Sequence, residues 1–180
     1  MPVRHISARQ LVRAALIAAL YAALCLALAP LSYGPVQVRL AEALTLLPVL
    51  CAEAVPGVAI GCFFANLLGG APIDMLVGTG ATLAAALLSR RLREVRWPRS
   101  TRGGHKGLPI AAALPPVLLN ALIVGAELTL LYFPAGSPAA VWLANMASVG
   151  AGQLISCGLG VALVWLVERQ PTLHRLLTEN

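Results

Sequence analysis

The sequence predicts an all-α integral membrane protein with six transmembrane helices in one membrane domain, residues 1–180. Hydrophobic residues make up 59% of the chain and charged residues only 11%, at a mean hydropathy of +0.83, whereas a soluble domain is about 25% charged. At about 20 residues per span, the apolar segments use nearly the whole chain and leave no room for a soluble domain. They show no alternation of period two, so we expect helices and not strands.

The first span is expected at 11–30, and three arginines, Arg4, Arg9 and Arg13, lie before it or in its first residues. A basic start and an apolar run ending in "LALAP" are also typical of a signal peptide. The proline directly after the would-be cleavage site and the equally apolar remainder of the chain oppose cleavage. We therefore expect a retained first span.

The second and third spans, 39–54 and 56–70, are short for a hydrocarbon core of about 30 Å. A single interfacial stretch is the alternative interpretation. Pro56 and Gly57, which follow Glu53, indicate a turn. A hairpin of two short spans is the interpretation that we favour.

The remaining spans are expected at 73–89, 108–133 and 139–167, with a basic loop at 90–107. Of the thirteen lysines and arginines, three lie before the first span or in its first residues, seven lie in that loop and two follow Val167. Such residues near span ends stay on the cytoplasmic side. Six spans place these twelve cations on one side, with both termini cytoplasmic, whereas five or seven spans separate the last two from the others.

The basic loop carries Trp97 among its arginines, a combination that also occurs in nucleic-acid-binding patches. A loop held inside by its positive charge, with Trp97 at the level of the lipid headgroups, explains the same residues. We therefore expect no nucleic-acid partner.

Polar residues are rare in the spans and gather toward the outer half of the predicted bundle. Ionisable groups cost free energy inside a membrane and usually face a cavity or a partner. Asn120 and Glu127 are seven residues apart, nearly two turns, and so share one helix face. We expect a polar pocket that opens outward and binds a small ligand through Arg39, Glu42, Asn66, Asp74, Asn120, Glu127, Asn145 and Gln153.

Simpler interpretations of the same residues stay open at this point. Arg39 and Glu42 can pair with each other at the headgroup level, and the amides can hold helices together by hydrogen bonds. Asp74 follows Pro72 and can serve only as a helix N-cap.

Small residues form a stripe along the first span, at Ala14, Ala18 and Ala22. Such a stripe permits close contact with another helix. A partner protein docked on it and ordinary packing within the bundle are both consistent with the pattern.

Motifs of enzyme chemistry are missing from the sequence, which has no GxxxxGK[ST] loop, HExxH or GxSxG element. The four cysteines lie in apolar stretches, at none of the spacings of zinc or redox sites. We expect no enzyme, no cofactor and no metal site. Any use of ATP must come from another subunit.

Four stretches of the sequence resemble one family, and together they extend from about residue 10 to residue 168. They are "YGPVQVRLAEALTLLP", "GCFFANLLGGAPIDMLVGTGATLAAAL", "LPPVLLNALIVGAEL" and, more weakly, "NMASVGAGQLISCGLGVAL". These stretches are similar to the QueT family of queuosine-precursor transporters, the substrate-binding S components of energy-coupling factor (ECF) transporters.

The resemblance implies a six-helix S component in the cell membrane of a prokaryote, which captures a 7-deazaguanine precursor of queuosine on the outer side. It also implies a transmembrane coupling protein and two ATPase subunits as partners, with the alanine-rich first helix as the docking surface. Glu127 and Glu42 are then expected to accept hydrogen bonds from the ligand, with Arg39, Asn120 and Asn145 as supporting contacts. Asn66 and Asp74 are expected at the outer rim.

One departure from the family pattern concerns Gln153, which stands in "GQL" where we expect an acidic residue in a "GEL"-like element. The loss of this charge predicts a preference for a neutral precursor over the cationic aminomethyl form. Two other functions remain as alternatives to the transporter subunit. One is a membrane scaffold or assembly protein without transport activity, and the other is a secondary transporter that works alone on another small polar metabolite.

Overall fold

The computed structural model describes residues 7–32, 38–69, 72–97, 107–132 and 138–178. This part of the chain is helical, with seven α-helices and one 3-10 helix. In chain order they are α1 (Ala8–Ala27), α2 (Ala29–Ser32), η1 (Leu40–Val49), α3 (Ala54–Leu68), α4 (Asp74–Arg91), α5 (Ile110–Tyr132), α6 (Ala139–Arg169) and α7 (Pro171–Thr178).

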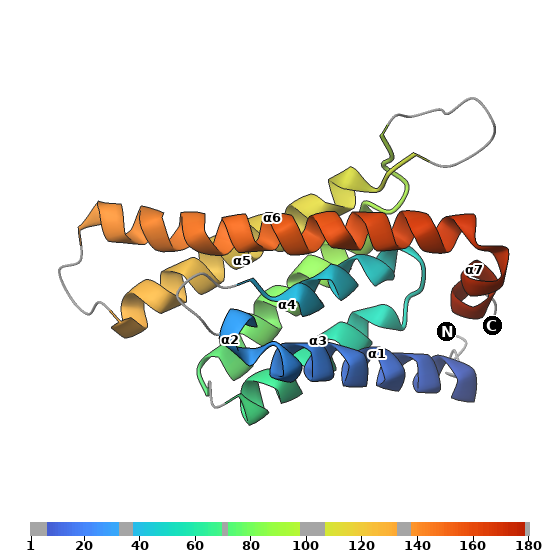
Figure 1. Ribbon diagram of the computed structural model, residues 1–180, viewed down its shortest axis with the longest axis horizontal. Helices are drawn as coiled ribbons and strands as arrows, with labels where there is room; N and C mark the ends of the chain where they lie inside the picture. The colour runs from blue at the N-terminus through green and yellow to red at the C-terminus, as the bar shows by residue number, and fades with distance from the viewer. Residues whose placement is uncertain (1–6, 33–37, 70–71, 98–106, 133–137, 179–180) are drawn as a thin grey trace, which may run out of the picture.

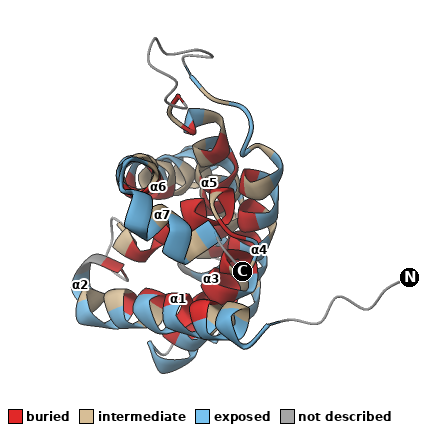
Figure 2. Ribbon diagram, turned by 90° about the vertical axis from the view of Figure 1, so that its right-hand side faces the viewer, coloured by how far each residue is buried: buried red, intermediate tan, exposed pale blue. Residues whose placement is uncertain are grey.

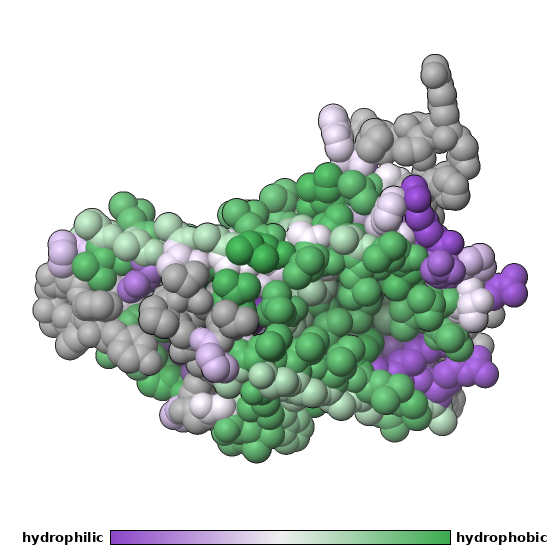
Figure 3. Space-filling view, in the orientation of Figure 1, coloured by the Kyte–Doolittle hydropathy of each residue, from purple (hydrophilic) through white to green (hydrophobic). Residues whose placement is uncertain are grey.

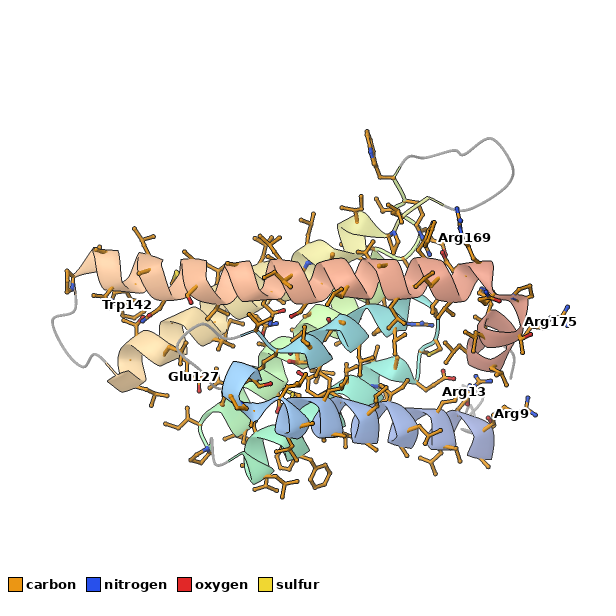
Figure 4. The ribbon with its side chains drawn as sticks, in the orientation of Figure 1. Arg9, Arg13, Glu127, Trp142, Arg169 and Arg175 are labelled. Atoms are coloured by element: carbon orange, nitrogen blue, oxygen red, sulfur yellow. The ribbon has the colours of Figure 1, made fainter. Side chains whose placement is uncertain are left out.

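Six long segments, α1, η1, α3, α4, α5 and α6, lie side by side and alternate in direction along the chain (Figure 1). The start of α1 and the short α7 therefore lie at one end of the bundle. Arg9, Arg13, Arg169 and Arg175 mark this end, which we call the basic end, whereas Glu127 and Trp142 lie toward the other (Figure 4). These four arginines are among the twelve cations that the sequence predicts on one side, and the side of the membrane that they face stays a prediction.

Three helices are long and apolar enough to cross a membrane: α1, residues 110–131 of α5, and α6. Two shorter apolar helices, η1 and α3, accompany them. Large hydrophobic side chains such as Leu16, Leu118 and Leu154 point outward from the bundle, and hydrophobic residues cover the middle of the face in Figure 3. An apolar surface of this extent is typical of a protein in contact with lipid.

The second predicted span, 39–54, differs from expectation because it is a ten-residue 3-10 helix that ends at Val49. At about 2.0 Å per residue it is roughly 20 Å long, less than the core of a bilayer. The predicted turn at Pro56 and Gly57 is also wrong, since both residues lie in the first turns of α3. A proline near the start of a helix loses no intrahelical hydrogen bond, so the chain turns earlier, at 50–53.

Helices α1 and α3 approach each other closely along the alanine stripe of α1. A Cβ added at Gly61 would lie 2.8 Å from the carbonyl oxygen of Ala18, so this crossing needs a glycine. Ala18 is buried there, and Ala14 and Ala22 are half-buried. Figure 2 shows the opposite side of α1 exposed; this side carries Ala15, Ala19 and Ala23.

Ion pairs join segments at the basic end. Arg13 of α1 lies 2.8 Å from Glu53 and also donates to the carbonyl oxygen of Leu177 in α7. Arg96 forms two hydrogen bonds to the carboxylate of Glu168, 2.8 and 3.1 Å long. Arg13 thus neutralises Glu53 in a largely buried contact.

Part of the predicted basic loop, 98–106, lies outside the described residues. Trp97, at its edge, is 70% exposed and pairs with Leu108 in an isolated β-bridge. Its position at the headgroup level stays a prediction.

Candidate functional site

A buried ion pair between Arg39 and Asp74 lies at the centre of the candidate site. Arg39 precedes η1 in an extended conformation, and Asp74 is the first residue of α4. The guanidinium also donates to the carbonyl oxygen of Ser32. The pair thus ties three segments together away from the basic end.

The alternative in which Arg39 pairs with Glu42 is wrong. Glu42 is 1% exposed and accepts hydrogen bonds from the hydroxyl groups of Tyr21, at 2.5 Å, and Thr82, at 3.3 Å. Because Arg39 lies outside the helix and has an extended backbone, the spacing of three residues does not bring the two side chains together.

Asn66 of α3 supports the start of α4 by donating to the backbone carbonyl of Asp74 at 2.9 Å. Asp74 itself is not an N-cap, since Ile73 occupies that position. Within the part of the chain that the structure describes, neither Asn66 Oδ1 nor Asp74 Oδ1, both buried, accepts a hydrogen bond. A Cβ at Gly78 would lie 2.7 Å from Asp74 Oδ1, so this glycine leaves space for the carboxylate.

Glu127 of α5 is 7% exposed, and neither of its carboxylate oxygens has a hydrogen-bond partner among the described residues. Its carboxyl group lies within hydrogen-bonding reach of the carboxyl group of Asp74, and Arg39 is the cation that acts on it. Asn120, two turns earlier, is also buried and donates to the carbonyl oxygen of Pro116 within its own helix. The face of α5 that carries Asn120 and Glu127 therefore lies inside the bundle.

A small cavity of about 10 Å³ joins the start of η1 to α5 and α6. Its size is close to that of one water molecule. Polar groups and two valines form its wall: Arg39, Asn120, Val124, Val149 and Gln153. A ligand larger than water needs these side chains to move apart.

The structure thus brings most of the predicted site residues to one region, which we call the polar site: Arg39, Glu42, Asn66, Asp74, Asn120, Glu127 and Gln153. Asn145 differs from them, because it donates to Thr129 Oγ1 at 2.9 Å and joins α5 to α6. It is not among the residues around the cavity. Its part in binding stays a prediction.

Tyr21 and Thr82 belong to the same network and were missed by sequence reasoning. The single phenol hydroxyl of α1, in a run of alanine and leucine, is the signal that points to Tyr21. Thr82 carries no comparable signal, because threonine often bonds to the backbone of its own helix.

The predicted docking stripe of Ala14, Ala18 and Ala22 lies on the side of α1 that contacts α3. The bundle itself occupies much of this surface. Docking of a partner there stays a prediction.

In chemical terms, the polar site combines three carboxyl groups with one guanidinium and three amides. The described residues contain no group of three or more His, Cys, Asp or Glu side chains arranged to hold a metal ion. The site is instead suited to a small organic ligand, with hydrogen-bond acceptors from the carboxylates and donors from Arg39 and the amides.

Comparison with known proteins identifies the family. The profile of the QueT transporter family matches residues 11–169. A protein named "Queuosine precursor transporter QueT" from Lactococcus lactis subsp. cremoris (strain MG1363) is 34% identical over 90 residues, 47% of this chain and 53% of that relative. The match spans about half the length of the curated relative, and no solved structure matches the chain. The chain therefore belongs to the QueT transporter family, a family of transporters and not of enzymes.

Proposed function

We propose that this protein is the substrate-binding membrane subunit of an ATP-driven uptake transporter for a queuosine precursor of the 7-deazaguanine type. The polar site is the binding site in this proposal. The observation that carries it is the buried carboxyl group of Glu127, which lies beside the Arg39–Asp74 pair and forms no ion pair of its own among the described residues. Membership in the family and the name of the relative support the choice of ligand.

The chemistry of a deazaguanine edge fits this site. Its ring N–H and amino groups are donors that a carboxylate can accept together, and its carbonyl oxygen accepts from a guanidinium or an amide. Glu127 and Glu42 then accept from different donors of the ligand, and Arg39, Asn120 and Gln153 surround it. Asn66 and Asp74 hold the rim, and Asn145 keeps α5 and α6 together.

The membrane topology that accompanies this function has six crossings and cytoplasmic termini, in the cell membrane of a prokaryote. In this topology η1 and α3 form the short hairpin, and the basic end faces the cytoplasm. The polar site then lies in the outer half, where a ligand arrives from outside.

Energy for uptake comes, in this proposal, from a transmembrane coupling protein and two ATPase subunits. We place their docking surface on α1. Because Ala14, Ala18 and Ala22 line the side toward α3, the exposed Ala15, Ala19 and Ala23 are the residues that extend this surface outward.

Calorimetric titration of the purified protein in detergent tests the binding function. The compounds are 7-cyano-7-deazaguanine, its 7-aminomethyl analogue, guanine and a panel of vitamins. We expect saturable binding of a deazaguanine, selective over guanine, and binding of the 7-aminomethyl compound that is about 10-fold or more weaker in Glu127→Gln. Glu94→Gln is the matched control, because the Glu94 side chain is 76% exposed and lies near α7 at the basic end. Folded protein that binds no deazaguanine overturns the proposal.

Co-purification tests the proposed partners separately. We expect the tagged protein to bring a coupling protein and two ATPase subunits with it from its native membrane. Transport by the purified chain alone in proteoliposomes contradicts this proposal and favours a secondary transporter. A protein partner without any bound small ligand favours the scaffold.

A further inference from the structure

The unpartnered polar atoms in the interior are all oxygens. Seven buried side-chain atoms lack a hydrogen-bond partner among the described residues, and none of them is a nitrogen. Five are carboxylate or amide oxygens of the polar site and can only accept when the acids are ionised: Glu42 Oε2, Asn66 Oδ1, Asp74 Oδ1, Glu127 Oε1 and Glu127 Oε2. The complementary ligand must therefore supply donors in excess of acceptors.

The polar site also has an excess of negative charge, because it contains three carboxyl groups and one guanidinium. Arg39 is paired with Asp74, and Glu42 receives two hydroxyl donors. Glu127 forms no ion pair among the described residues, and its carboxyl group lies within hydrogen-bonding reach of the carboxyl group of Asp74. Two buried carboxyl groups so close together cannot both be ionised without a cost in free energy, so positive charge brought by a ligand is most favourable beside Glu127.

We propose that Glu127 receives a protonated primary amine of the ligand, so that the site selects a cationic aminomethyl deazaguanine over neutral forms. This inference rests on the proposed function and assigns the specificity of the same site. An ammonium group carries three donors, and the oxygens around it are those of Glu127 and the free Oδ1 of its acidic neighbour Asp74. Contacts between such charged partners are stronger than neutral hydrogen bonds.

The proposal reverses the preference that Gln153 predicts from the sequence alone. Gln153 lines the cavity and supplies an amide, which neither adds nor removes charge. The two carboxyl groups across the site, Asp74 and Glu127, share only one guanidinium. The negative charge that the family pattern predicts near residue 153 is thus already present on α4 and α5.

Two ligands of nearly equal size but different charge isolate the contribution of the charge to the binding affinity. These are 7-aminomethyl-7-deazaguanine, which is cationic at neutral pH, and 7-hydroxymethyl-7-deazaguanine, which is neutral. We expect the wild-type protein to bind the aminomethyl compound about 10- to 100-fold more tightly, the range of a charge-assisted contact in a buried site.

Variants then locate the selectivity. Glu127→Gln is expected to lose most of this ratio, by weakening the aminomethyl compound about 10-fold or more while changing the hydroxymethyl compound by less than about threefold. Glu127→Asp keeps the charge and is expected to retain part of the ratio. Glu94→Gln serves as the exposed control and is expected to retain all of it.

Each result has a distinct meaning. Equal affinity of the wild-type protein for the two compounds, or an equal loss for both in Glu127→Gln, overturns the assignment and leaves the proposed function intact. Failure of folded wild-type protein to bind any deazaguanine overturns the proposed function itself. The wild-type ratio needs no variant, so misfolding of Glu127→Gln does not prevent the test.

Discussion

Arg39 and Asp74 are 35 residues apart in the chain and form a buried ion pair that joins the start of η1 to the start of α4. Their side chains are 6% and 12% exposed, so water replaces little of the contact. In such a place, the loss of one partner leaves the other charge uncompensated, which is much worse than the loss of both.

Asp74→Asn is therefore expected to lower stability by about 3 kcal/mol or more, because it leaves the Arg39 guanidinium buried without its counter-ion. The double variant Arg39→Met with Asp74→Leu is expected to recover most of this loss but to bind no deazaguanine. Thermal unfolding in detergent and the titration measure the two effects. The single variants Arg39→Met and Asp74→Leu are the references for the double variant. A loss of stability in the double variant equal to the sum of their two losses would contradict this prediction.

Tyr21→Phe removes the shorter of the two hydrogen bonds to Glu42. We expect a loss of about 1–3 kcal/mol, since a buried acceptor then lacks its donor. A cycle with Glu42→Gln measures the coupling of the two side chains. Additive effects would show that Tyr21 stabilises the protein by packing alone.

Two glycines provide a matched pair for the contact between α1 and α3. Gly61→Ala is expected to destabilise the protein by about 1–3 kcal/mol, because its Cβ meets the backbone of α1. Gly80→Ala in α4 meets nothing within 4 Å and is expected to be neutral or to add up to about 1 kcal/mol of helix stability. If Gly61→Ala and Gly80→Ala changed the melting temperature equally, the close approach of α1 and α3 at Gly61 would be excluded.

The basic end offers a similar comparison between two arginines. Arg96→Lys loses the two-pronged contact with Glu168 and is expected to cost about 1–2 kcal/mol. Arg93→Lys alters an exposed pair with Glu94 and is expected to change stability by less than about 0.5 kcal/mol. Ligand affinity should stay the same in both, because these contacts lie away from the polar site.

Much of the architecture follows from the sequence because hydropathy and the distribution of cations constrain it strongly. The alternating order of the six segments and the collection of arginines at one end are examples. The type of the second segment could not be predicted, since Leu40–Val49 is apolar and consistent with either helix geometry. Its 3-10 form depends on packing against neighbouring helices.

The site residues were predictable as residue types but not as pairs. A charged or amide side chain in an apolar span draws attention wherever it lies, as with Glu127 and Asn120. The partner of Arg39 depends on the extended backbone before η1 and on the distance between two segments. Sequence spacing contains neither, so the nearby Glu42 was a natural but incorrect choice.

The 3-10 geometry of η1 also affects how far this short segment reaches. Each residue advances about 0.5 Å more than in an α-helix, so ten residues gain roughly 5 Å of length. The C-terminal end of η1 is held by Arg90, which donates to the carbonyl oxygen of Pro48 at 3.0 Å. The extra length therefore extends the N-terminal end of η1, where it brings Arg39 close to Asp74. Ten residues in the wider and shorter α-form would leave this guanidinium about one helical turn short of its counter-ion.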